Sequence, residues 1–387
     1  MRAKTFLRSA RIDNFKAIRS GPPVAFTPLT VLIGHNGSGK SSLIEALETY
    51  RTIVDRDLDA AMARWFGMPH VWNKRARHDL DGAEMYRNPI RFRLSGWNTT
   101  GSYRTDMRIN ARPGYNGIFI QDEMASLAGN RTLRRAASGH FSVTQGKKIL
   151  LKPRTPLGPG ESALPHEVRE MVAGWQFLSL TPDRMGAPVP RKMAVGGVLP
   201  LNRDGSNLAQ YLLNIRDRDP SAFDGIVESM QAVLDYSRNF EPVETQEIQR
   251  TMYVQMRERD FEIPGWMLST GTVRILAFLA VLRNPMPPPL IVIEELENGL
   301  DPRTIHLLLE EIREAVQDGR TQVIVTTHSP YLLDLVPLQT IVLVERHEGG
   351  EPSFRRPFDS REVKSWARTF APGQLYTAGR FHRGGKR

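Results

Sequence analysis

Apolar residues follow two spacings along the chain, one typical of buried strands and one typical of helices. Continuous runs of branched apolar residues predict buried strands at 30–33, 290–293, 323–326 and 341–344. Apolar residues at helical spacing predict helices at 42–53, 207–217, 222–236, 271–283 and 302–317. Because strands alternate with helices toward both ends of the chain, parallel strand pairing is favoured there. The fold we predict for the whole chain is α/β, with a mixed sheet flanked by helices and a second lobe of strands and helices.

The middle of the chain is less regular. Alternating apolar and polar residues predict half-exposed strands at 91–94 and 103–109. Further strands are expected at 117–121 and 147–151. We therefore expect a core lobe formed by 1–55 and 271–387, and an inserted lobe of strands and helices formed by 56–270.

Composition narrows the chemistry. The 387 residues include no cysteine, which excludes disulfides and thiolate sites. The net charge of +10 favours a polyanion partner, and a surplus that only aids solubility is an equal alternative. Basic groups that could contact phosphate lie at 74–77, 131–135 and 380–387. The longest apolar run, 275–282, is too short to span a bilayer, so we expect a cytoplasmic protein without a membrane partner.

The strongest motif is the sequence GHNGSGKS at 34–41, which fits G-x-x-x-x-G-K-[ST] between a predicted strand and a predicted helix. Its glycines allow positive φ, so backbone N–H groups can point at phosphates beside a helix N-terminus. Lys40 can reach the β- and γ-phosphates, and the Ser41 hydroxyl can bind Mg²⁺.

Two adjacent carboxylates, Glu294 and Glu295, follow the strand predicted at 290–293. Successive residues of a strand point to opposite faces, so the two acids need not share a role. One can hold a hydrated Mg²⁺ while the other polarises a water beside the γ-phosphate. Read alone, the pair would be an exposed charged loop; beside a phosphate loop, magnesium–ATP chemistry is the better interpretation.

Two further segments carry polar residues where a strand ends or a helix begins. His328 follows the strand at 323–326 and could donate to a γ-phosphate oxygen or to the attacking water. Read alone, a structural histidine is the simpler interpretation. Ser269 and Gly271 precede the helix at 271–283 and form either an anion-receptive start or a plain N-cap.

Taken together, these segments resemble a known family. The four blocks lie at 34–41, 266–274, 290–295 and 323–330. In this order they resemble the ABC-type ATPase heads of RecF and structural-maintenance-of-chromosomes (SMC) proteins, and most of all the OLD-like AAA-family ATPases of bacteria. Further similar segments lie at 12–18, 202–208, 293–302 and 373–376. The stretch from about 55 to 170 carries almost no similar motif.

The resemblance implies a role for each site residue. The residues that would bind the nucleotide are Gly34, Asn36, Gly37, Ser38, Gly39, Lys40, Ser41 and Ser42. Ser41 and Glu294 would hold Mg²⁺, Glu295 would be the general base, and His328 the switch histidine. Ser269 and Gly271 would form the signature motif that contacts ATP on a second protomer, with Asp301 in the loop that crosses the dimer interface. ATP would then join two copies.

The chain also departs from this family. Glu294 stands where most cassette ATPases have aspartate, Thr270 and Thr272 replace the usual glycine and glutamine, and Gln176 is a candidate for the glutamine that senses Mg²⁺. OLD nucleases carry a nuclease domain after the histidine block, and only about 60 residues follow His328 here. We therefore expect no nuclease site, and an effector, such as a nuclease, on a separate chain.

The function expected from the sequence is ATP hydrolysis by a homodimer or larger homo-oligomer that gates an effector protein or DNA, in anti-phage defence or DNA repair. The alternative is the nucleotide-binding subunit of an ABC transporter, which shares the phosphate loop and the signature chemistry. A third class is a scaffold that binds ATP without hydrolysing it, because it needs the same pocket.

Overall fold

The computed structural model describes residues 6–76, 85–112, 117–191, 199–245, 250–346 and 350–381. The chain forms two compact units. Unit 1 comprises Met1–Trp175, Leu338–Phe370 and Leu375–Arg387, and unit 2 comprises Gln176–Pro337 and Ala371–Gln374. These boundaries differ from the lobes expected at 1–55 with 271–387 and at 56–270. The boundaries differ because of contacts between residues far apart in the sequence. The N-terminal strand pairs with a strand that begins at residue 90, and the helix that begins at residue 270 packs within unit 2.

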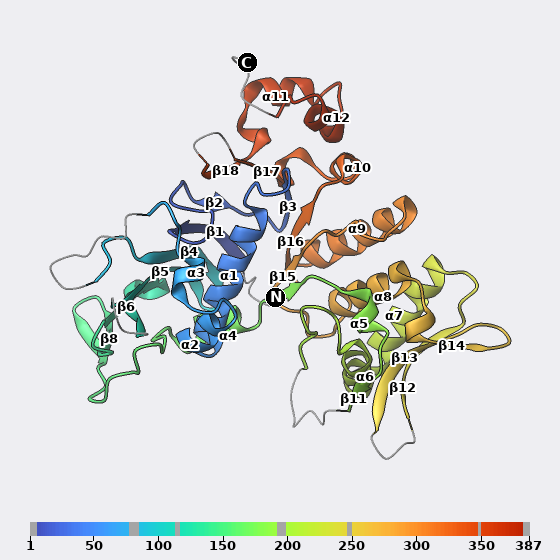
Figure 1. Cartoon of the computed structure of the whole chain (residues 1–387), viewed down its shortest axis with the longest axis horizontal. Helices are drawn as coiled ribbons and strands as arrows, with labels where there is room; N and C mark the ends of the chain where they lie inside the picture. The colour runs from blue at the N-terminus through green and yellow to red at the C-terminus, as the bar shows by residue number, and fades with distance from the viewer. Residues whose placement is uncertain are drawn as a thin grey trace. The chain divides into compact units, whose positions relative to one another are not determined.

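Unit 1 contains an eight-stranded antiparallel sheet in the order β2-β1-β4-β5-β6-β7-β8-β9 (Figure 1). Its strands are β1 (Phe6–Asp13), β2 (Val24–Ala25), β4 (Ile90–Asn98), β5 (Gly101–Ala111), β6 (Ile118–Leu127), β7 (Arg131–Ala136), β8 (Phe141–Gln145) and β9 (Lys148–Leu151). Side chains alternate between the faces, and in β4 every second residue from Ile90 to Leu94 is buried. These buried residues give the sheet an apolar inner face.

Helix α1 (Lys40–Asp55) covers that inner face. Its Tyr50 is fully buried, with its ring 5.7 Å from that of Phe92 and its hydroxyl donating to Thr105 Oγ1 at 2.9 Å. Helices α2 (Leu58–Ala63) and α4 (His166–Ala173) pack beside α1. Unit 1 also includes the short helices α3 (Met68–Val71) and α11 (Arg361–Trp366).

A second group of strands in unit 1 leads into the phosphate loop. β3 (Leu29–Ile33) pairs in parallel with β17 (Ile341–Arg346), which pairs antiparallel with β18 (Pro352–Arg355). All five residues of β3 are buried. A mixed sheet was expected, and this group is mixed.

Unit 2 is built on three parallel strands, β10 (Gln176–Leu178), β15 (Leu290–Ile293) and β16 (Gln322–Thr327). A smaller antiparallel sheet holds β11 (Val189–Pro190), β12 (Asn239–Glu244), β13 (Thr251–Arg257) and β14 (Glu262–Pro264). Its helices are α5 (Pro182–Met185), α6 (Leu208–Arg218), α7 (Pro220–Val233), α8 (Thr270–Leu282), α9 (Pro302–Gln317) and α10 (Pro330–Asp334). Helix α12 (Pro372–Thr377) carries residues of both units.

Two helices of unit 2 show how the sequence sets their environment. Helix α8 is apolar on nearly all sides and is almost entirely buried between neighbours that include α7 and α9. Helix α9 is amphipathic, begins at Pro302 after the N-cap Asp301, and buries one stripe against α8 and β16. The α/β class expected from the sequence is confirmed. No helix among the described residues has the length and apolar character needed to cross a bilayer.

Candidate functional site

The loop between β3 and α1 has the geometry of a phosphate loop. Gly37 and Gly39 have φ of 74° and 114°, which glycine adopts without strain. A Cβ on Gly34 would lie 2.0 Å from the Val344 carbonyl oxygen, so only glycine fits at that position. Helix α1 has no side-chain cap at Gly39, so its first N–H groups lack the usual side-chain acceptor. An anion would satisfy these groups.

Polar side chains inside this loop also fit a phosphate. Lys40 is 7% exposed, and its Nζ donates to the carbonyl oxygens of Gly34 at 2.6 Å and His35 at 3.2 Å. Ser38 Oγ is buried and has no hydrogen-bond partner among the described residues. Ser41 is exposed at the start of α1. These donors match the acceptor oxygens of a triphosphate.

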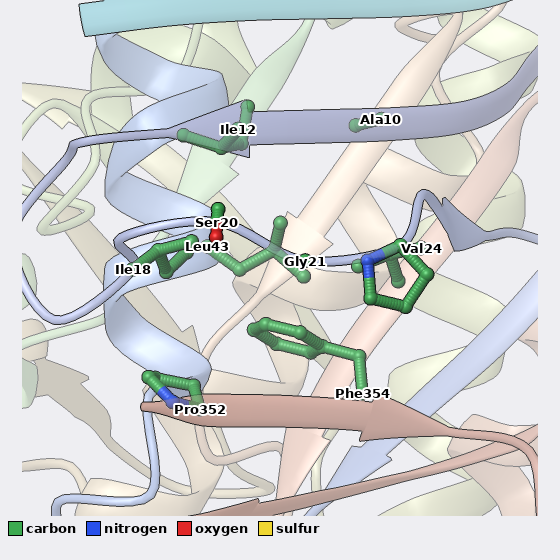
Figure 2. A pocket seen from close by; sticks show the side chains of 10 residues that line it. Ala10, Ile12, Ile18, Ser20, Gly21, Val24, Leu43, Pro352 and Phe354 are labelled. Carbon is green, nitrogen blue, oxygen red and sulfur yellow. The ribbon is translucent and has the colours of Figure 1, made fainter. Parts of the chain in front are cut away.

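A small apolar cavity lies beside this loop and is not a second nucleotide site. It lies between Ile12 of β1, Leu43 of α1 and Phe354 of β18, as Figure 2 shows. Its volume of about 20 Å³ has room for no more than a water molecule. Pro352, which also lines the cavity, lies 2.6 Å from where a Cβ of Gly39 would be, so the cavity wall packs against the phosphate loop.

In unit 2, the two carboxylates follow β15 in different environments. Glu294 continues the strand pairing, with its N–H donating to the Leu178 carbonyl at 2.9 Å. Its side chain is 17% exposed and forms an ion pair with Arg203. Arg203 belongs to the segment 202–208 that drew attention in the sequence, but the pairing itself was not foreseen. A carboxylate held in this way keeps a fixed orientation, which a metal ligand requires.

Glu295 turns away from the strand in a left-handed conformation, with φ of 51°. Three neighbours hold it. Its N–H donates to Thr326 Oγ1 at 2.9 Å, its carbonyl accepts from Arg274 Nη2 at 2.9 Å, and its Oε2 accepts from Asn298 Nδ2 at 2.6 Å. Its side chain is exposed. The carboxylate is therefore both oriented and accessible, as a general base must be.

Arg274 is a functional candidate that the sequence reasoning missed. It is 5% exposed in α8 and also donates from Nη1 to the Leu180 carbonyl at 3.1 Å. Burial lowers the pKa of Arg274, and the nearby Glu295 and Glu297 act in the opposite direction. A signal was available, because Arg274 is the one charged residue in an otherwise apolar helix. A buried charge needs partners, and here they are the carbonyls that flank the candidate site.

The start of α8 packs against the turn that carries the acids. Ser269 caps α8 by accepting from the Thr272 N–H at 3.1 Å, so the plain N-cap foreseen as one alternative is present. A Cβ on Gly271 would lie 2.7 Å from the Gly299 carbonyl oxygen, which leaves room for glycine only. The candidate signature and the turn at 294–301 therefore form one packed surface.

Asp301 and His328 are tied to the same turn. Asp301 caps α9, accepting from the N–H groups of Arg303 at 2.9 Å and Thr304 at 3.1 Å, and hydrogen bonds from Thr304 lower the pKa of Asp301. The N–H of half-buried His328 donates to Glu297 Oε1 at 2.7 Å. This hydrogen bond links the backbone of His328 to the turn at 294–301.

Unit 2 thus brings together Glu294, Glu295, His328, Ser269, Gly271 and Asp301, while unit 1 brings together 34–42. Their convergence on one nucleotide stays a prediction. Gln176 is buried in β10, and its Nε2 donates to the Leu201 carbonyl at 2.6 Å, so a backbone group of unit 2 already engages its amide.

Two family models match the chain. Residues 198–334 match "AAA domain, putative AbiEii toxin, Type IV TA system", and residues 6–53 match "AAA ATPase domain". The first segment contains the turn at 294–301 with His328, and the second contains the phosphate loop. The resemblance to AAA-family ATPases is therefore confirmed. No curated protein matches the chain.

Three solved structures that are similar to the chain are heads of SMC proteins. An Smc head bound to the C-winged helix domain of ScpA shares 11% identity over 90% of this chain and 97% of that one, with a TM-score of 0.47. The SMC head domain from Thermotoga maritima shares 13% identity over 90% of this chain and 98% of that one, with a TM-score of 0.44. The third is an Smc head domain with an extended coiled coil, bound to the C-terminal domain of ScpA derived from Pyrococcus furiosus. It shares 11% identity over 94% of this chain and 100% of that one, with a TM-score of 0.45.

Proposed function

We propose that the protein is an ATPase in which Glu295 is the general base. The observation that carries the proposal is the three-point restraint on this residue by Thr326, Arg274 and Asn298. It leaves an exposed, fixed carboxylate at the end of a buried strand. The matches to AAA models over both segments support nucleotide chemistry at these positions.

The residues divide the work as follows. The loop at 34–42 binds the triphosphate through backbone N–H groups, Ser38 and Lys40. Ser41 and Glu294 would hold Mg²⁺, which would neutralise phosphate charge. Glu295 accepts a proton as the water oxygen bonds to the γ-phosphorus, and the bond from that phosphorus to the β–γ bridging oxygen breaks, releasing ADP and phosphate. His328 would donate to a γ-phosphate oxygen.

The same turn would pass the nucleotide state to a second copy of the chain. Ser269 and Gly271 lie against it, and Asp301 ends it. We infer that ATP joins two protomers through these residues and that hydrolysis separates them. The dimer then gates an effector protein or DNA. The description of the family model that matches 198–334 names a toxin of a type IV TA system. This description supports a role in defence more than a role in repair.

The test is ATP turnover and nucleotide binding in Glu295→Gln, with Glu310→Gln as a matched control on the exposed face of α9. We expect Glu295→Gln to bind ATP normally and to lose about 10²–10⁴-fold in turnover, the usual contribution of a general base. Lys40→Ala should lose tight ATP binding, and Glu310→Gln should match the wild type. Normal turnover in Glu295→Gln would place the base elsewhere.

A further inference from the structure

The outer face of the eight-stranded sheet, opposite α1, is rich in arginine and hydroxyl residues. Strand pairing and alternation assign side chains to it across β1, β4, β5, β6 and β7. Its charged residues are Arg8, Arg11, Arg91, Arg93, Arg104, Arg108, Arg134, Asp13, Asp106 and Asp122. Seven arginines and three aspartates give this outer face a net charge of +4, a large share of the chain's +10.

The acids gather toward one end of the outer face and leave the rest purely basic. Asp13, Asp106 and Asp122 pair with Arg93, Arg91 and Arg108. Arg11 also pairs with Asp13, with its Nε 3.4 Å from Asp13 Oδ1. The remaining three arginines, Arg8, Arg104 and Arg134, are exposed and form no ion pair with any described residue. Their positive charge is therefore available to a ligand.

The hydroxyl groups lie in a row beside these arginines. Ser9, Ser95, Arg104, Ser126, Thr132 and Thr144 are successive partners across six strands. At about 4.8 Å between strands the row is roughly 24 Å long. Trp97 is 40% exposed at its edge, with the Arg8 guanidinium 5.5 Å from the ring. The row contains no carboxylate, so nothing in it repels an anion.

We propose that this outer face binds the phosphate backbone of a nucleic acid. Arginine, serine and threonine are among the side chains that contact phosphate oxygens, and here they form an array that extends across six strands. An array of this kind suits a long polyanion better than a small one. The proposal goes beyond ATP hydrolysis and does not depend on it.

The structure also sorts the basic groups singled out in the sequence. At 131–135, Arg131 pairs with Glu167, and Arg135 is buried and donates to the Gly158 carbonyl at 2.8 Å. Only Arg134 of that group faces outward with its charge available. Residues 77 and 382–387 lie outside the described residues.

The test is a titration of the full chain against a fluorescent duplex DNA of mixed sequence, without ATP, over a range of salt concentrations. We expect log K to fall linearly with log salt concentration. The triple variant Arg8→Ser, Arg104→Ser, Arg134→Ser should bind more weakly on every sequence, with a slope shallower by about 3, near one for each phosphate contact. Single-stranded DNA and RNA of equal length identify the preferred nucleic acid.

A matched control removes the same charge from exposed positions off the outer face, in Arg56→Ser, Arg259→Ser, Arg368→Ser. It should keep the wild-type slope, and both variants should keep wild-type thermal unfolding. Equal losses in both triple variants, or none in the first, would overturn the proposal. So would capture of the wild type by phosphatidylserine vesicles but by no nucleic acid. If the wild type lacked ATPase activity but bound DNA with the expected salt dependence, only the proposed function would be overturned.

Discussion

At the scale of single residues, Glu295 shows how neighbours fix an unfavourable backbone conformation. A left-handed conformation in a residue other than glycine costs about 1–3 kcal/mol and persists only when the surroundings impose it. Thr326, Arg274 and Asn298 each bond a different part of Glu295, so they select this conformation together. Removing one of them should release the carboxylate without touching the phosphate loop.

Arg274→Met tests this directly, because methionine keeps the apolar stem and removes both hydrogen bonds. We expect kcat for ATP to fall about tenfold or more, the equivalent of about 1.4 kcal/mol or more in the barrier. KM should change little, since the phosphate loop is intact, and Arg274→Lys should recover part of kcat. Steady-state kinetics of the two variants check this prediction.

Arg283→Met is the control for that experiment. Arg283 follows the same helix and pairs with Glu311 at 2.7 Å, but it does not bond the turn at 294–301. The substitution Arg283→Met should lower the free energy of unfolding without lowering kcat. If Arg274→Met lost stability alone and kept kcat, Arg274 would be structural and not a positioning residue.

The sequence indicated candidate residues but not the neighbours that hold them. Glu294, Glu295 and Lys40 could be identified because each follows or interrupts a strong local pattern. Arg203 and Arg274 could not be assigned, because their partners lie 91 and 21 residues away along the chain. No local pattern encodes which carbonyl or carboxylate a distant arginine will reach.

At the scale of elements, local signals placed the helices of the site closely. Helix α9 spans Pro302–Gln317, as its spacing and Pro302 predicted, and α1 and α8 begin within two residues of the expected starts. Several strands were missed, among them β7, β8 and β10. A strand of three residues such as β10 forms because its neighbour β15 supplies the pairing, which propensity alone cannot show.

The N-cap of α9 gives a prediction at this scale. Asp301→Ala removes three hydrogen bonds from Arg303 and Thr304, so it should lower the free energy of unfolding by about 0.5–2 kcal/mol at neutral pH. Because the pKa of Asp301 is lowered in the folded state, its contribution is complete above the unfolded pKa of about 3.9 and is lost as pH falls below that value.

Urea unfolding of the wild type and Asp301→Ala at several pH values measures this effect. The difference between the two curves should shrink as the solution is acidified below about pH 4. A difference that stayed constant with pH would show that the carboxylate charge does not contribute to the cap. Ser360→Ala, which removes an uncharged cap from α11, should show such a constant difference.

At the scale of the molecule, the order of motifs along the chain predicted the class of fold but not the division into units. β1 pairs with β4 across about 80 residues, which draws the supposed insertion into the N-terminal unit. The segment after residue 270 joins unit 2 because α8 is buried among helices on both sides of it in the sequence. Such divisions depend on long-range packing, so motif positions do not reveal them.

Association of two copies is the remaining prediction at this scale. With ATP and Mg²⁺, Glu295→Gln should run as a dimer in size exclusion with light scattering, since it binds ATP and does not hydrolyse it. Adding Ser269→Arg places a bulky charge at the candidate signature and should leave a monomer that still binds ATP. Ser360→Arg removes a comparable serine cap from α11 and should leave the dimer intact. If Glu295→Gln with bound ATP stayed monomeric, the enzyme would act without a second copy, and its signature segment would serve the fold alone.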